Sequence, residues 1–295
     1  MRGDQLAALV GPHLPDDLRI RVLPFHAGML PPLAMRAFAL AIPVGAIVVF
    51  VKSAAKGLTQ DHLAALRSRD ARIGLDSIDT PLDQIDFDLF DFQIAASLAG
   101  QSALSERLAQ LGKRGVPVEL LHHHHDPRLA AIERPVDRPF RCGYVGAPGN
   151  ALIPPGITYD VERIDVRYTR DFTRSLRRIA GLTLHYGVRP MPAPTASISR
   201  EYKPFTKGFT AAACASNILV NREADDAVAL LGEDYPFLVS ATNLDSVVDG
   251  LVRAKQASPG PLWNEGLDRM RALRELVAPV TLATRLREIV DVVAP

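Results

Sequence analysis

The hydrophobic positions of the chain form short apolar runs that alternate with segments of helical periodicity. In the first half, apolar runs such as "RIRVLPF", "AIVVFVKS", "ARIGLDSI" and "VPVELLHHHH" are separated by helical stretches such as "QSALSERLAQLGKRG". Alternation of this kind is typical of βαβ units on a parallel sheet. The order of the elements therefore predicts an α/β fold.

The alternation is interrupted by "DPRLAAIERPVDRPFR", where prolines and charged residues replace the apolar rhythm, and it restarts with "FRCGYVG". After Asn243 the apolar positions recur every three or four residues, which predicts a helical tail. We therefore expect two Rossmann-like parallel-sheet domains that face each other across a cleft. The first covers residues 1–135, and the second covers residues 136–295 and ends in closing helices.

Composition and charge narrow the possible partners and location. The net charge of +1 creates no strong field, so we expect no nucleic-acid partner. Cys142 and Cys214 lie far apart in apolar surroundings, which favours two reduced thiols in a cytoplasmic protein over a disulfide. The N-terminus shows no secretory signal, and the most hydrophobic run, residues 37–51, is shorter than the roughly 20 residues that span a bilayer. Peripheral membrane contact stays open.

Basic residues gather where the second domain is expected to bind an anion. Arg189 follows the strand in "GLTLHYGVRP", and Lys203, Thr206, Lys207 and Gly208 precede or begin the helix in "KPFTKGFTAAACAS". A helix N-terminus with two lysines and an arginine at one sheet edge suits a pyrophosphate. The alternatives are a solvated loop with ordinary lysines and a surface salt bridge for Arg189.

The remaining candidates give weaker signals. Gly146 follows the strand in "FRCGYVG" and would let the backbone approach a ligand, although a tight turn without a ligand explains it equally well. In the run His122–His125 at most two side chains share one face of a strand, which is too few for a closed zinc site. We expect one histidine of the run to face the cleft, with His124 as the candidate, and the sequence leaves open which of the four does so. Asp86 and Asp88 precede a strand and are interpreted as solvated, so no metal site is predicted.

The stretch "KPFTKGFTAAACASNILV" resembles the signature region of nucleotide-sugar glycosyltransferases of the GT-B type, in which E-P-F-G-x-x-x-x-E-A-x-A-x-G-x-P-V-V runs from loop through helix into strand. Pro204 and Phe205 match the motif, and Ala212 falls on its first alanine. Lys203 and Ala211 replace both family glutamates. "DFDLFDFQIAAS", "VELLHHHHDPRL" and "FRCGYVG" are also similar to family segments, so the resemblance covers most of the chain in loose form.

This resemblance implies a metal-independent glycosyltransferase, hexosyltransferase-like, with GT-B architecture. Such an enzyme would use a nucleoside-diphosphate sugar as co-substrate, would need no other cofactor, and would act on an unknown glycan, lipid or small-molecule acceptor. His26 of "VLPFHAGMLPP" corresponds in position to the catalytic histidine base of some inverting members of the family. In the family the second glutamate holds the ribose of the nucleotide. Because this chain lacks it, we expect Asp225 or Asp226 to make the ribose contact. A nucleotide-sugar epimerase-like enzyme and a non-catalytic nucleotide-sugar-binding protein remain alternatives.

Overall fold

The computed structural model describes residues 2–25, 32–134, 138–190 and 199–294. The chain forms two compact units. The first unit comprises Met1–His122, Thr195–Pro204 and Pro279–Pro295, and the second comprises His123–Pro194 and Phe205–Ala278. Whether residues 1–135 and 136–295 act as separate domains stays a prediction.

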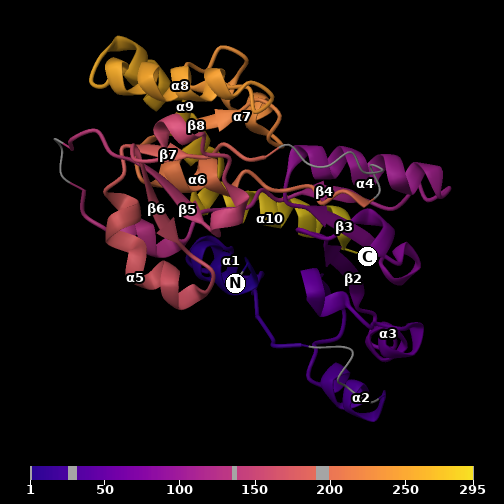
Figure 1. The fold of residues 1–295 in the computed structure, drawn as a ribbon. Helices are drawn as coiled ribbons and strands as arrows, with labels where there is room; N and C mark the ends of the chain where they lie inside the picture. Colours follow the sequence, from indigo (N-terminus) through magenta and orange to yellow (C-terminus); the bar gives the residue numbers. More distant parts are fainter. Residues whose placement is uncertain (1, 26–31, 135–137, 191–198, 295) are drawn as a thin grey trace. The chain divides into compact units, whose positions relative to one another are not determined.

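The first unit contains a four-stranded parallel sheet with helices around it (Figure 1). Its strands follow one another in space as they do in the chain: β1 (Ile47–Val51), β2 (Arg72–Asp76), β3 (Phe92–Ala95) and β4 (Val118–Leu120). Its helices are α1 (Arg2–Val10), α2 (Pro32–Leu40), α3 (Gln60–Arg67), α4 (Leu98–Gln110) and α10 (Pro279–Val293). Short 3-10 turns occur at Gly11–His13, Lys52–Ala55, Leu82–Gln84 and Phe87–Leu89.

The two inner strands of this sheet, β2 and β3, are buried almost throughout, whereas the outer strands β1 and β4 are mostly half-buried. All four residues of β3 are buried, and Phe92 is completely inaccessible. Its ring fits against β2 because residue 74 is a glycine: a Cβ there would stand 2.2 Å from Cζ of Phe92. At the end of β3, the Ser97 hydroxyl accepts a hydrogen bond from the backbone N–H of Gly100 at 3.0 Å and caps α4.

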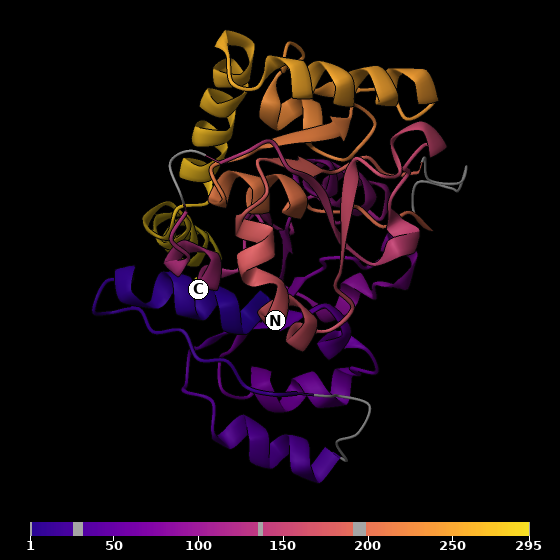
Figure 2. The same ribbon diagram turned by 60° about the vertical axis from the view of Figure 1, so that its left-hand side comes forward.

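Helices α1 and α10 lie side by side on the first unit (Figures 1 and 2). In α1, the buried Arg2 guanidinium pairs with Asp76 at 2.5 Å and donates to the backbone oxygen of Leu121 at 2.7 Å. In α10, Arg285 Nε donates to the backbone oxygen of Leu120 at 2.9 Å. These bonds hold α1 and α10 beside the carboxyl ends of β2 and β4.

The second unit contains a five-stranded parallel sheet in the order β6-β5-β7-β8-β9. The strands are β5 (Cys142–Gly146), β6 (Val161–Asp165), β7 (Leu184–Tyr186), β8 (Asn217–Asn221) and β9 (Leu238–Val239). The helices are α5 (Thr169–Ala180), α6 (Thr206–Ala213), α7 (Ala227–Leu231), α8 (Leu244–Ala257) and α9 (Pro261–Leu276). Short 3-10 turns occur at Pro127–Ala131, Pro148–Asn150 and Pro155–Ile157.

Small residues explain the position of α6, which lies between β7 and β8 in sequence. Ala211, Ala212 and Ala213 are all buried, and the absence of larger side chains lets α6 pack closely against α9. The helix ends at Cys214, and the chain then enters β8, whose residues are all buried. A loop, a buried helix and a central strand thus follow one another within "KPFTKGFTAAACASNILV".

The predicted α/β class, the two Rossmann-like parallel sheets and the helical tail are confirmed. The apolar stretch "RIRVLPF", however, does not form the strand that its pattern suggests. Residues 19–25 have no regular secondary structure, and the Val22 and Leu23 side chains are 41% and 43% exposed. Among the helices of the described ranges, none is long and apolar enough to cross a membrane.

Candidate anion-binding site

The order of strands in the second unit defines where a ligand is expected. The chain places β6 on one side of β5 and then returns to place β7 on the other side. In open parallel sheets, ligands bind beyond the carboxyl ends of the strands where the strand order reverses in this way. The first unit shows no reversal among its described strands. The best position for a site is therefore the crevice beyond β5 and β7.

A cavity of about 210 Å³ lies at this position. It is lined by residues at the ends of β5 and β7, by the start of α6, and by residues of and near α5: Val145, Gly146, Val166, Phe172, His185, Tyr186, Arg189, Thr206, Lys207 and Thr210. Of these described lining residues, none is an aspartate or a glutamate. The cavity therefore combines apolar walls with two cationic side chains.

Lys207 differs from an ordinary solvated lysine. Its ammonium group donates to the backbone oxygen of Val145 at 2.5 Å and lies 4.2 Å from the centre of the Tyr144 ring. The carbonyl and the face of the ring stabilise the charged form. Burial, and to a smaller extent the nearby Arg189 guanidinium, oppose them and lower the pKa of Lys207 to about 7. An anion in the cavity would relieve both opposing effects.

Gly146 provides the space that Lys207 occupies. Its φ angle of +142° lies in a region that residues with a side chain rarely adopt. A Cβ at this position would come within 2.9 Å of the Tyr144 hydroxyl and 3.1 Å of the Lys207 ammonium nitrogen. Tyr144 in turn donates from its hydroxyl to the backbone oxygen of Ala147 at 2.8 Å, which holds the turn after β5. A glycine is therefore required by both backbone and packing, and the approach of a ligand to this turn stays a prediction.

Arg189 and Thr206 complete the polar part of the cavity. The backbone N–H of Arg189 donates to the Asn221 side chain at 3.0 Å, which joins the loop after β7 to the end of β8. Thr206 is the first residue of α6, and the preceding Phe205 provides no side-chain cap. The N-terminal N–H groups of α6 and its positive dipole end are thus directed to the same crevice as the two cations.

His185 belongs to this cavity, and the sequence analysis missed it. The side chain is 3% exposed, and its Nε2 atom is buried without a hydrogen-bond partner. Burial, with smaller effects of Lys207 and Arg138, lowers the pKa of His185 to about 3, so the imidazole is neutral at physiological pH. The available signal was the polar His185 in the short apolar strand "GLTLHY", two residues before Gly187.

Other predicted site residues do not line this cavity. Gly208 lies in α6, but a Cβ there would stand 2.0 Å from the Phe205 ring, so packing alone requires this glycine. Lys203 belongs to the first unit, where it pairs with Glu201 and lies 3.5 Å from Asp79. Asp226 is buried, with a left-handed φ of +63°, at the start of α7. Their roles in binding stay predictions.

The histidine predictions remain untested. His26 lies outside the described residues. His124 is 1% exposed, and its Nδ1 atom is 2.8 Å from the backbone oxygen of His125. Burial, followed by the charges of Arg2 and Arg285, lowers the pKa of His122 to about 4. His122, just after β4, is therefore a neutral group at physiological pH.

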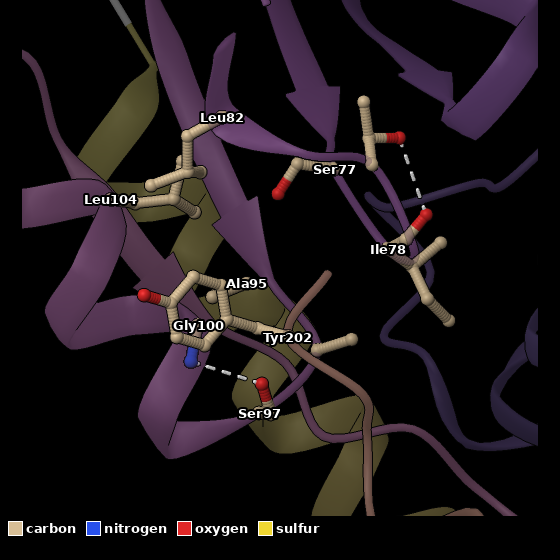
Figure 3. A pocket seen from close by; sticks show the side chains of 10 residues that line it. Ser77, Ile78, Leu82, Ala95, Ser97, Gly100, Leu104 and Tyr202 are labelled. Atoms are coloured by element: carbon tan, nitrogen blue, oxygen red, sulfur yellow. Dashed lines mark hydrogen bonds between the residues drawn. The ribbon is translucent and has the colours of Figure 1, made fainter. Parts of the chain in front are cut away.

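A small hollow of the first unit is shown in Figure 3. The ring of Tyr202 lies beside Gly100, close to the bond between Gly100 and Ser97. The hollow has a volume of about 10 Å³, which is enough for one water molecule at most. Asp86 and Asp88 make local contacts: Asp86 accepts a hydrogen bond from the backbone N–H of Asp88 at 3.0 Å, and Asp88 forms an ion pair with Lys113.

Comparison with known proteins shows the fold but leaves the family open. No family model matches the chain, and no curated protein does. Among solved structures, HepE from Anabaena in complex with UDP-glucose is similar at a TM-score of 0.58 and 13% identity, over 92% of this chain and 86% of that one. The trehalose-6-phosphate synthase OtsA is similar at a TM-score of 0.56 and 10% identity, over 89% and 75% of the two chains.

A sucrose-phosphate synthase from Thermosynechococcus elongatus is similar at a TM-score of 0.52 and 12% identity, over 98% of this chain and 92% of that one. These similarities extend over most of the chain and over both parallel sheets. The chain therefore has the GT-B fold, as its resemblance to the signature region implied. At such low identity the similarity concerns the fold, and function has to be argued from the site.

Proposed function

We propose that this protein is a glycosyltransferase that transfers a sugar from a nucleoside-diphosphate sugar to an acceptor. The observation that carries the proposal is the pair of cations, Lys207 and Arg189, beside a cavity at the strand-order reversal of the second sheet. No aspartate or glutamate among the described lining residues competes with an anion there. The solved complex of HepE with UDP-glucose, on the same fold, supports this ligand class.

The chemistry follows from where negative charge develops. When the bond between the sugar and the diphosphate breaks, the departing diphosphate gains charge, and donors fixed around it stabilise the transition state. Lys207, Arg189 and the N-terminal N–H groups of α6 would provide this stabilisation. Each charge-assisted hydrogen bond contributes about 1.5 to 3 kcal/mol. We accordingly propose a reaction that needs no metal ion and no cofactor besides the co-substrate.

Further roles belong to the same proposal. His26 would act as the base that removes the proton from the acceptor hydroxyl, and His124 would bind the donor sugar. Asp226 would contact the ribose, and Lys203 and Gly208 would assist with the pyrophosphate. The acceptor would be a glycan, a lipid or a small molecule, in the cytoplasm or at a membrane surface, and nucleic acid is not an expected partner.

One observation favours a second function, the binding of nucleotide sugars without catalysis. The two positions of the family glutamates are occupied by Lys203, which is ion-paired, and by Ala211, which is completely buried. A protein that binds nucleotide sugars without turning them over would show these replacements too. A nucleotide-sugar epimerase would instead change the donor sugar without an acceptor.

A thermal-shift screen of nucleoside diphosphates and their sugars tests the proposal. A specific ligand at about 100-fold excess over its Kd stabilises the native state by roughly 2.7 kcal/mol. We expect one nucleoside diphosphate to raise the Tm of the wild type and to raise it much less after Arg189→Gln. If no nucleotide or nucleotide sugar changes the Tm at millimolar concentration, the proposal is wrong.

A further inference from the structure

The lysines of this chain differ in their surroundings. Lys52, Lys113, Lys203 and Lys255 each form an ion pair with a carboxylate, and their side chains are 30% to 62% exposed. Lys207 contacts a backbone carbonyl and an aromatic ring instead, and it has no ion pair among the described residues. The charged side chain that acts on its pKa is another cation, Arg189.

This environment favours loss of the proton from Lys207. The groups that face it are the Arg189 guanidinium, the neutral His185 imidazole and the Tyr144 ring. With its pKa at about 7, a large fraction of the amine is neutral at physiological pH, whereas an exposed lysine is almost fully protonated. A neutral lysine amine in an apolar site is a nucleophile. The cavity of about 210 Å³ gives a carbonyl compound room to reach it.

We propose that Lys207 forms a reversible imine with aldehydes that carry a phosphate group, a class that includes open-chain aldose phosphates. Arg189, on the same cavity, would hold the phosphate while the aldehyde carbon approaches the Lys207 nitrogen. The proposal needs the cavity and its two cationic side chains, and it does not rest on sugar transfer.

The chemistry balances without an oxidant or reductant. The nitrogen lone pair of Lys207 attacks the aldehyde carbon, a proton passes from the nitrogen to the carbonyl oxygen, and a carbinolamine results. Its hydroxyl group leaves as water together with the second proton of the nitrogen, which forms the carbon–nitrogen double bond of the imine. Addition of water reverses both steps, so the modification is reversible until a hydride donor such as cyanoborohydride reduces the imine to a stable amine.

The test compares two aldehydes on the intact wild-type chain. Glyceraldehyde 3-phosphate or glyceraldehyde is added at pH 7.5 with cyanoborohydride, and peptide mass spectrometry then measures the label on each lysine. We expect glyceraldehyde 3-phosphate to label Lys207 at least tenfold faster than Lys203 or Lys255. Glyceraldehyde, which lacks the phosphate, should label Lys207 at least tenfold more slowly than its phosphorylated counterpart.

Two variants and a pH series complete the test. Arg189→Gln should reduce labelling of Lys207 by glyceraldehyde 3-phosphate to the rate seen with glyceraldehyde, and Lys207→Arg should abolish label at this position only. Labelling of Lys207 should rise between pH 6 and 8, in line with its pKa of about 7. Equal labelling of all lysines, or equal rates with the two aldehydes, would overturn the proposal, whatever the outcome of the nucleotide screen.

Discussion

Replacement of Lys207 by methionine is expected to weaken the binding of a nucleoside diphosphate without unfolding the second unit. Methionine is unbranched like lysine and one heavy atom shorter, so its apolar stem can still pack beside the Tyr144 ring while the charge is lost. The backbone oxygen of Val145 loses its donor, and the cost of burying an ammonium group disappears. Because these two effects oppose each other, we expect the free energy of unfolding to change by about 1 kcal/mol or less.

The loss of affinity follows from the contact that is removed. A charge-assisted hydrogen bond to phosphate contributes about 1.5 to 3 kcal/mol. Near pH 7.5, part of the Lys207 population must first take up a proton because its pKa is about 7, which costs up to about 1 kcal/mol. The remaining difference is about 0.5 to 2 kcal/mol, so at about 1.4 kcal/mol per factor of ten the Kd should rise by roughly two- to thirtyfold.

Isothermal titration calorimetry with UDP, or with the diphosphate that the thermal-shift screen selects, measures this change. Lys255→Met is the matched control, because Lys255 lies in the same unit, is 62% exposed and pairs with Asp160 at 3.5 Å. We expect the control to bind as the wild type does. Equal affinities of Lys207→Met and Lys255→Met would refute the reasoning and remove Lys207 from the diphosphate site.

Three further predictions concern the same cavity. Arg189→Gln should weaken diphosphate binding by roughly ten- to a hundredfold in the same titration, since it removes the second cation; a change of less than twofold would contradict this. Gly146→Ala should lower both the Tm and the affinity, because the new Cβ would crowd Tyr144 and Lys207 at a positive φ, and a wild-type Tm would argue against it. Affinity should fall as the pH rises from about 7 to 9, since the Lys207 pKa of about 7 leaves an amine that must be protonated on binding, whereas Lys207→Met should show a flat profile.

Acid should also destabilise the protein through His185. Its pKa is lowered from 6.5 in the unfolded chain to about 3 in the native state, so the unfolded state binds more protons between these values. The stability that His185 contributes is therefore complete above pH 6.5 and is lost as the pH falls toward 3. Chemical denaturation at several pH values should show a weaker pH dependence in His185→Phe, and an unchanged dependence would refute this role.

Much of the fold could be predicted from the sequence because period and composition determine it locally. The strands β2 and β8 come from apolar runs that are buried on both faces, and their alternation with helices predicted the parallel sheets. The segment at residues 19–25 is also a mainly apolar run, but it pairs with no strand and has no regular secondary structure. Strand formation depends on a neighbouring edge, which the sequence of one segment does not reveal.

The site was predictable only in part, for a physical reason. Arg189 and Lys207 follow a strand or begin a helix, and their role at a sheet edge follows from their place in the chain. His185 lies inside β7, where a polar residue is recognised as part of a site only once the cavity beside it is known. Lys203 is close to Lys207 in sequence, yet its carboxylate partners Asp79 and Glu201 place it with the first unit.

The central claim is that Lys207 and Arg189 hold the diphosphate of a sugar donor whose sugar is transferred. The most direct measurement is the release of nucleoside diphosphate from the donor that the screen selects, with a pool of glycan, lipid and small-molecule acceptors and without it. We predict that acceptors stimulate release by the wild type, and that the double variant Lys207→Met with Arg189→Gln releases diphosphate at least a hundredfold more slowly, as expected for the loss of about 3 kcal/mol or more of transition-state stabilisation. Equal rates of release by the wild type and a folded double variant would contradict the account.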